Sequence, residues 1–400
     1  TYKPYVAWCH PASTSQENNA TFNFGQGDKD GENNYTDDNG RGGFRYRPPS
    51  GFLACCTANM KDADYAPIGP NSAAGTPDKH FDTLLYTGSG YKNFKVRGLA
   101  FQPDLVWIKN RDRSNSHMLY DSVRGAGKDL NPDDNSVEAD NTNALSQFDA
   151  GGFTFGDSGT VNYINENHVA WCWKAGNDTT QNSDGTLQVT TSVNQDAGFS
   201  IITGTTVNVE ANDMTETFGH GLNTTPDVIL VRNLEHSSGT QGARIFFPPL
   251  TTTNLKAMAL TATALFTNSS YKTFEIDGNL IKMGREGVEN NGEKFVCYAW
   301  HSVEGYSKFG SYVGNASTDG PFVYLGFRPA MIIFKNVSTT SQNWEIFDNK
   351  RPGFNPNNRR LYPSQTSVEP AASARVDFLS NGFKIRTSAG THINGDGNTI

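Results

Sequence analysis

One sequence pattern occurs three times in this chain, at residues 98–110, 221–233 and 325–336. In each copy a proline is followed six residues later by a basic residue and seven residues later by an asparagine. The three sets are Pro103, Lys109 and Asn110; Pro226, Arg232 and Asn233; and Pro329, Lys335 and Asn336. Because self-similarity at a fixed register is the signature of repeated structural units, the pattern predicts three related domains.

Two further landmarks accompany the pattern. An aromatic pair with a spacing of five occurs at Phe148 and Phe153, at Phe266 and Tyr271, and at Phe378 and Phe383. In the first and third copies a glycine precedes the second aromatic residue, which is typical of a tight hairpin turn. We therefore expect Phe153, Tyr271 and Phe383 to be structurally equivalent.

The other landmark is an apolar closing strand, at residues 169–174 and 295–300, which contains Cys172 and Cys297. We expect both thiols at the same strand position, buried and unpaired, because the two cysteines belong to separate domains. The third copy reaches this offset only at about residue 400. We therefore expect an incomplete closing strand there, a natural chain that continues with such a strand, and a third domain that is the least stable.

Composition indicates an all-β chain. Hydrophobic residues make up 36% and glycine 40 of 400 residues, and the apolar runs are short and rich in β-branched and aromatic residues. A single core is not expected at this length, so each repeat should have its own core. The net charge of −8 without a basic cluster argues against nucleic acid as a ligand. No window is apolar enough for membrane insertion.

The first 60 residues have a different character. Residues 22–26 and 44–59 resemble the C-terminal end of a SPRY or concanavalin-A-like jelly-roll sandwich, as found in phage proteins. The predicted organisation is therefore the end of a lectin-like sandwich (1–60), a linker (61–80) and three tandem β-sandwich-like repeat domains. These span 81–178, 195–304 and 305–400, the last one incomplete. The lack of a start methionine suggests a fragment of a longer gene product.

The first repeat also resembles a known family. Residues 81–90, 98–111, 117–125, 153–156 and 169–176 are similar to a domain family of tail-fibre and tail-associated proteins of marine bacteriophages, often placed after a SPRY-like lectin domain. The resemblance implies a virion tail location after assembly in the host cytoplasm, other tail proteins as partners, and a homo-oligomer, with a trimer favoured. It implies adhesion or a structural task rather than catalysis.

Several side chains are candidates for ligand binding. His117, Tyr120, Asp121 and Arg124 form a polar series in the first repeat, which suggests a binding cluster, a catalytic His beside an Asp, or an Arg–Asp pair that orients a loop. No serine or cysteine nucleophile accompanies the series, which argues against catalysis. The series has no evident counterpart at residues 243–249 or 344–348. Trp171 and Trp173 share one face of a strand, so they either pack in a core or form an exposed platform on which sugar rings stack.

The repeated basic residue and asparagine allow two interpretations. They could bind a sugar, or the base could end a buried strand while Asn110, Asn233 and Asn336 begin the following turn, as asparagine often does. No cofactor is expected. Calcium is the one candidate metal, at an acidic loop with Asp28, Asp30 and Asp37, because carboxylates at alternating positions are typical calcium ligands.

These observations predict a phage virion appendage that attaches without catalysis to a glycan or protein on the host surface. Repeats with shared strands and different loops suit multivalent binding. One alternative is a purely structural fibre shaft or virion decoration. Another is a glycan depolymerase, which would need two carboxylates about 5–10 Å apart in a cleft. The sequence offers no such pair.

Overall fold

The computed structural model describes residues 35–44, 46–50, 54, 68–69, 72–207, 215–235, 244–247, 257–260, 265–266, 274–284, 291–339, 342–388 and 391–400. The chain divides into two compact units, residues 1–65 and 66–400. In the described part of the first unit, Tyr35 and Phe44 form an antiparallel bridge. Most of the segment that resembles the end of a lectin-like sandwich lies outside the described residues.

The second unit is almost entirely β, as the sequence predicts. Repeat 1 forms one sheet in the order β1-β9-β3-β4, a second in the order β2-β8-β7, and a small β5-β6 ladder, all antiparallel. A short 3₁₀ turn, η1 (Pro77–Lys79), precedes these strands. Their bounds are β1 (Phe81–Thr87), β2 (Phe94–Arg97), β3 (Leu105–Asn110), β4 (Met118–Asp121), β5 (Lys128–Asp129), β6 (Ala139–Asp140), β7 (Leu145–Asp149), β8 (Gly152–Phe155) and β9 (Asn167–Trp173).

Repeat 2 has the same plan with additional strands. One sheet has the order β10-β11-β12-β20-β14-β15-β16-β17, and the other has the order β13-β19-β18. The strands are β10 (Thr180–Asn182), β11 (Val189–Asn194), β12 (Phe199–Thr205), β13 (Glu216–Gly219), β14 (Val228–Asn233), β15 (Arg244–Phe246), β16 (Ala257–Ala259), β17 (Leu265–Phe266), β18 (Phe274–Asp277), β19 (Leu280–Met283) and β20 (Lys294–Trp300).

Repeat 3 forms a sheet in the order β21-β26-β25-β24 and the pair β22-β23. Its elements are β21 (Phe322–Tyr324), β22 (Met331–Phe334), β23 (Glu345–Asp348), β24 (Asn357–Arg359), β25 (Ala371–Leu379), β26 (Gly382–Ile385) and the one-turn helix α2 (Thr391–Asn394). Thr399 bridges to Val313, and its carbonyl accepts a hydrogen bond from the Val337 amide. The first residues of β9 and β20, Asn167 and Lys294, accept the equivalent bonds in the other repeats.

The registers confirm the equivalence of the three prolines. Each is followed two residues later by the start of a strand, and the pairs Leu105–Asp121 and Met331–Asp348 match position by position. The thiols of Cys172 and Cys297 are buried and free, as predicted. They are nevertheless not equivalent: Cys172 pairs with Val106, three residues after Pro103, whereas Cys297 pairs with Val231, five residues after its proline.

The hairpin landmark needs a correction in repeat 2. Phe148 pairs with Phe153 and Phe378 with Phe383, as the sequence predicts. The equivalent hairpin of repeat 2 is β18-β19, where Ile276 pairs with Ile281. Phe266 instead lies on β17, which pairs with β16 in the other sheet. Repeat 2 therefore keeps the spacing of five but replaces both aromatic residues with isoleucine.

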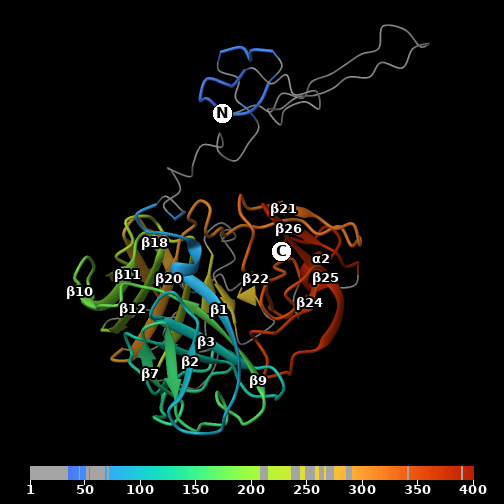
Figure 1. The fold of residues 1–400 in the computed structure, drawn as a ribbon. Helices are drawn as coiled ribbons and strands as arrows, with labels where there is room; N and C mark the ends of the chain where they lie inside the picture. The colour runs from blue at the N-terminus through green and yellow to red at the C-terminus, as the bar shows by residue number, and fades with distance from the viewer. Residues whose placement is uncertain are drawn as a thin grey trace. The chain divides into compact units, whose positions relative to one another are not determined.

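The three repeats lie against one another as three lobes around common hydrophobic contacts (Figure 1). Each repeat has a core of its own. A further core combines residues from all three, among them Trp171, Tyr298 and Ile346. Alternation along β9 explains this division, since Trp171 and Trp173 face the shared core while Cys172 faces the core of repeat 1. The three repeats therefore form one compact unit and not the expected string of independent domains.

Candidate functional site

Asp121 and Arg124 form an ion pair where repeat 1 meets repeat 2. Asp121 is the last residue of β4, and its Oδ1 accepts the backbone amides of Val123 and Arg124, which fixes the turn. The Arg124 Nε lies 2.5 Å from Asp121 Oδ2, and Nη1 donates to Glu138 Oε2 at 2.9 Å. The Arg124 side chain is 3% exposed. We call Asp121, Arg124 and Glu138 cluster 1.

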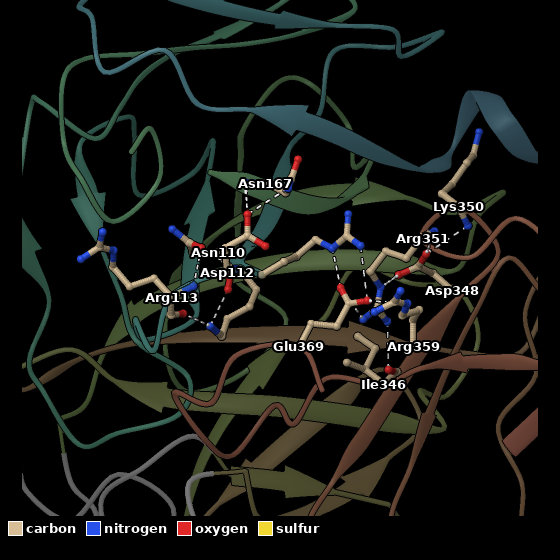
Figure 2. A network of polar contacts seen from close by, with 12 residues as sticks. Asn110, Asp112, Arg113, Asn167, Ile346, Asp348, Lys350, Arg351, Arg359 and Glu369 are labelled. Carbon is tan, nitrogen blue, oxygen red and sulfur yellow. Dashed lines mark hydrogen bonds and ion pairs between the residues drawn. The ribbon is translucent and has the colours of Figure 1, made fainter. Parts of the chain in front are cut away.

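Repeat 3 carries the same arrangement, shown in Figure 2. Arg351 donates to Asp348 at 2.6 Å and lies 3.8 Å from Glu369. The backbone amide of Glu369 donates to Arg111 of repeat 1, as that of Glu138 donates to Leu234 of repeat 2. Asp348, Arg351 and Glu369 are therefore cluster 3, the counterpart of cluster 1. Repeat 2 has Phe247 at the position of Asp121, after Phe246 on β15.

Each cluster accepts a hydrogen bond from the closing strand of a neighbouring repeat. The Tyr298 hydroxyl on β20 donates to Asp121 Oδ2 at 2.7 Å. The Trp171 Nε1–H on β9 donates to Asp348 Oδ2 at 3.1 Å, and the Arg351 guanidinium lies 5.7 Å from the Trp171 ring. Tyr298 and Trp171 occupy equivalent strand positions, opposite Leu230 and Trp107. The clusters thus join repeats 1 and 2, and repeats 3 and 1, by the same contact.

The remaining members of the predicted polar series are also internal. His117 accepts from the Trp107 indole at 2.9 Å through Nδ1, and its Nε2 lies 3.0 Å from the Tyr362 carbonyl of repeat 3. Burial holds the pKa of His117 well below its usual value, so the ring is neutral. Because Nδ1 accepts the indole N–H, Nε2 carries the ring proton and donates it to the carbonyl. The Tyr120 hydroxyl donates to Asp129 at 2.6 Å within repeat 1.

The two tryptophans form no exposed platform for sugar rings. Trp171 is fully buried, and Trp173 packs against Phe81 and Trp300 with ring centroids 4.9 and 6.4 Å apart. The strand is buried on both faces, which was the other interpretation of its sequence.

The repeated base and asparagine serve the strand end, as the second interpretation predicts. Lys109 is buried, and its Nζ donates to the carbonyls of Asn110 and Arg113. The Oδ1 atoms of Asn110, Asn233 and Asn336 each accept backbone amides of the following turn. Arg232 and Lys335 likewise donate to the carbonyls of Ser136 and Gln342.

The calcium prediction can be followed only at Asp37. Asp28 and Asp30 lie outside the described residues. The Asp37 carboxylate accepts the backbone amides of Asn39, Arg41 and Ala54, at 2.8–2.9 Å, so it organises its own turn. In the described part of the chain no group of three or more His, Cys, Asp or Glu side chains is placed to hold a metal ion.

A groove of about 610 Å³ lies beside cluster 1, between repeats 1 and 2. Repeat 1 contributes Arg124, Lys128 and Glu138. The described lining from repeat 2 is mostly polar: Thr186, Leu187, Gln188, Thr190, Thr203, Gly204, Thr205, Val207, Leu234, Lys294 and Phe295. The volume is in the range of small-ligand sites, which makes this groove the candidate binding site.

A family model spans all three repeats. It matches residues 76–400 and is described as a domain of unknown function, DUF7483. The chain belongs to the DUF7483 family. No curated protein and no solved structure gives a significant match. The DUF7483 match begins one residue before η1 and includes all three repeats. This extent agrees with the structure, in which the three repeats share a hydrophobic core.

Sequence reasoning missed the counterpart of cluster 1 in repeat 3, although the signal was present. Asp348 and Arg351 repeat the spacing of Asp121 and Arg124 after a strand. Glu138 and Glu369 follow their prolines by 35 and 40 residues, so variable loops hide their equivalence. The groove residues gave no signal, because single threonines and a glutamine on a β-rich chain are ordinary surface residues. Among the described residues no helix has the length and apolarity that crossing a membrane requires.

Proposed function

We propose that this protein is a non-enzymatic binding component of a phage virion appendage, a tail fibre or tail-associated protein that attaches to the host surface. The virion assignment rests on the resemblance of residues 81–176 to tail-associated domains. The observation that carries the binding role is the groove between repeats 1 and 2, whose hydroxyl, amide and charged side chains suit a polar surface ligand.

The chemistry of the groove favours binding over hydrolysis. Glycoside hydrolysis uses two carboxylates, one as acid and one as base or nucleophile. The described lining contributes one carboxylate, Glu138, and Arg124 donates to it at 2.9 Å. The neighbouring Asp121 is fully buried and bonded to Arg124 and Tyr298. This observation supports attachment and gives no support to a depolymerase.

A binding assay with the full chain tests the proposal. Labelled protein would be applied to intact bacterial cells and to an array of bacterial surface polysaccharides, and bound polysaccharides would be sized afterwards by gel filtration. We expect saturable binding to at least one surface and no shortening of the polysaccharide. Absence of binding to every cell and polysaccharide would refute attachment, and shortened chains would show a depolymerase.

A further inference from the structure

We propose that the groove between repeats 1 and 2 binds an uncharged, hydroxyl-rich oligosaccharide, and that Leu234 keeps this groove open. The inference rests on the proposed attachment function and names its ligand class and site. It follows from three features of the groove: the polar groups that line it, the pairing of its charges, and its difference from the equivalent junction of repeats 3 and 1.

The lining offers a row of hydrogen-bonding side chains on neighbouring strands. Thr190 and Thr203 lie opposite each other on β11 and β12, and Thr205 and Gln188 extend the row. The side chains of Gln188, Thr203 and Thr205 have no hydrogen-bond partner within the described part of the chain. Leu187 and Phe295 belong to the buried core of repeat 2 on the other face of these strands. Hydroxyl and amide groups that both donate and accept hydrogen bonds match the hydroxyls of a sugar ring.

The cations of the groove are already paired. Arg124 is bonded to Asp121 and Glu138. Lys128 lies 2.5 Å from Asp140, and Lys294 lies 3.2 Å from Glu235. An acidic polysaccharide would meet these carboxylates without an unpaired positive charge to attract it. The charge balance therefore favours an uncharged ligand.

The equivalent junction shows why Leu234 matters. Leu234 and Arg111 each follow the turn asparagine that ends β14 and β3. Arg111 reaches across the junction and forms an ion pair with Glu369, and Arg359 lies 3.7 Å from the same carboxylate. Leu234 has no group that can reach Glu138 in this way. The contact between repeats 1 and 2 therefore lacks the arginine that bridges repeats 3 and 1. The Glu138 carboxylate faces the groove instead.

Paired substitutions in the full chain test this site. The Thr203→Val, Thr205→Val double variant removes two hydroxyls that have no partner among the described residues, with little change in shape, and Thr87→Val is the matched control, at the repeat 1 position equivalent to Thr205. Calorimetric titration would use maltohexaose, cellohexaose, mannohexaose and galactohexaose, with oligogalacturonate as the acidic probe. We expect binding of at least one neutral sugar, weakened about tenfold in the double variant and unchanged in the control.

Leu234→Arg would place an arginine where Arg111 stands in repeat 1, and we expect it to abolish sugar binding. If its melting curve shows that this variant does not fold, the double threonine variant decides the question. Equal sugar binding by wild type and the double variant would refute the groove as the binding site, while the proposed attachment function would stand. Preference for oligogalacturonate would overturn the ligand class. Failure of wild type to bind these sugars, together with failure on cells and polysaccharides, would overturn both proposals.

Discussion

The Asp121 carboxylate accepts hydrogen bonds from both sides of the boundary between repeats 1 and 2. From repeat 2, the hydroxyl of Tyr298 donates to Asp121 Oδ2 at 2.7 Å, and Tyr298 is fully buried. Replacing it with phenylalanine keeps the ring and removes the donor. We expect Tyr298→Phe to lower the free energy of unfolding by about 1–3 kcal/mol, because a buried charged acceptor loses a partner.

Urea unfolding followed by far-UV circular dichroism measures this change. Tyr91→Phe is the control, since Tyr91 is 72% exposed, and it should change stability by less than about 0.5 kcal/mol. Equal stability of Tyr298→Phe and wild type would show that the hydroxyl adds nothing to the boundary.

Asp133 should make stability depend on pH. Its two carboxylate oxygens are buried without a well-formed hydrogen bond to the described residues, and burial raises its pKa from 3.8 to about 7. An acid with a raised folded-state pKa favours folding at low pH, and stability falls as pH rises from the unfolded pKa of 3.8 until the loss is complete near pH 7. From pH 5 to pH 8 we therefore expect this group to lower the free energy of unfolding by about 3 kcal/mol.

Asp133→Asn removes the titration and serves as the comparison. Unfolding in urea at pH 5 and pH 8 should show a smaller decrease for the variant than for wild type, because the other titrating groups are common to both. The same decrease in both proteins would contradict the assignment to Asp133.

The predictable residues are those whose role is local. The turns at Asn110, Asn233 and Asn336 could be predicted because the asparagine bonds to its own backbone neighbours. Arg124 was a predictable partner of Asp121, three residues away. Tyr298 was not, since it follows Asp121 by 177 residues and only the packing of two repeats brings them together. A polar series such as His117 to Arg124 looks the same in sequence whether it faces a ligand or another repeat.

At the scale of elements, β22 differs from its counterparts. β3 lies between β9 and β4, and β14 lies between β20 and β15, whereas β22 pairs only with β23 among the described residues. Three of its four residues are only half-buried, while β3 is buried throughout. We expect the amides of β22 to exchange with deuterium faster than those of β3 and β14 in native buffer, because fewer of them are protected by two neighbouring strands.

Hydrogen exchange read by mass spectrometry, with peptides that cover the three strands, checks this expectation. β26 is the internal control for repeat 3, because it lies between β21 and β25 and should exchange slowly. Equal protection of β22 and β3 would show that the edge of β22 is covered in solution.

Element prediction succeeded where spacing is short and failed where an insertion intervenes. The hairpins of repeats 1 and 3 follow from glycine turns and paired aromatics. In repeat 2 the strands β16 and β17 precede the hairpin, and Phe266 lies on β17, while Tyr271 lies outside the described residues. Ile276 and Ile281 carry the same contact, which shows that the site requires a large apolar side chain rather than an aromatic ring.

At the scale of the molecule, the length of the chain predicts a separate core for each repeat, and each repeat does have a core of its own. The shared core could not be anticipated, because a strand that is apolar on both faces does not reveal what each face contacts. Trp171 and Trp173 complete repeat 1 only by packing against repeats 2 and 3. A domain boundary drawn from repeat spacing therefore marks a unit of sequence, while residues 66–400 form the compact unit.

The shared core predicts that the three repeats unfold together. Native-state hydrogen exchange in increasing urea would follow β9, β20 and β26, one strand from each repeat, and we expect one common midpoint. Trp171→Ala should shift all three midpoints to lower urea, because a large side chain is lost from a core that every repeat contributes to, at a cost of about 3–5 kcal/mol. Leu85→Ala, on a residue that is 42% exposed, should leave them nearly unchanged. Separate midpoints, or a shift confined to β9, would mean that the repeats are independent domains after all.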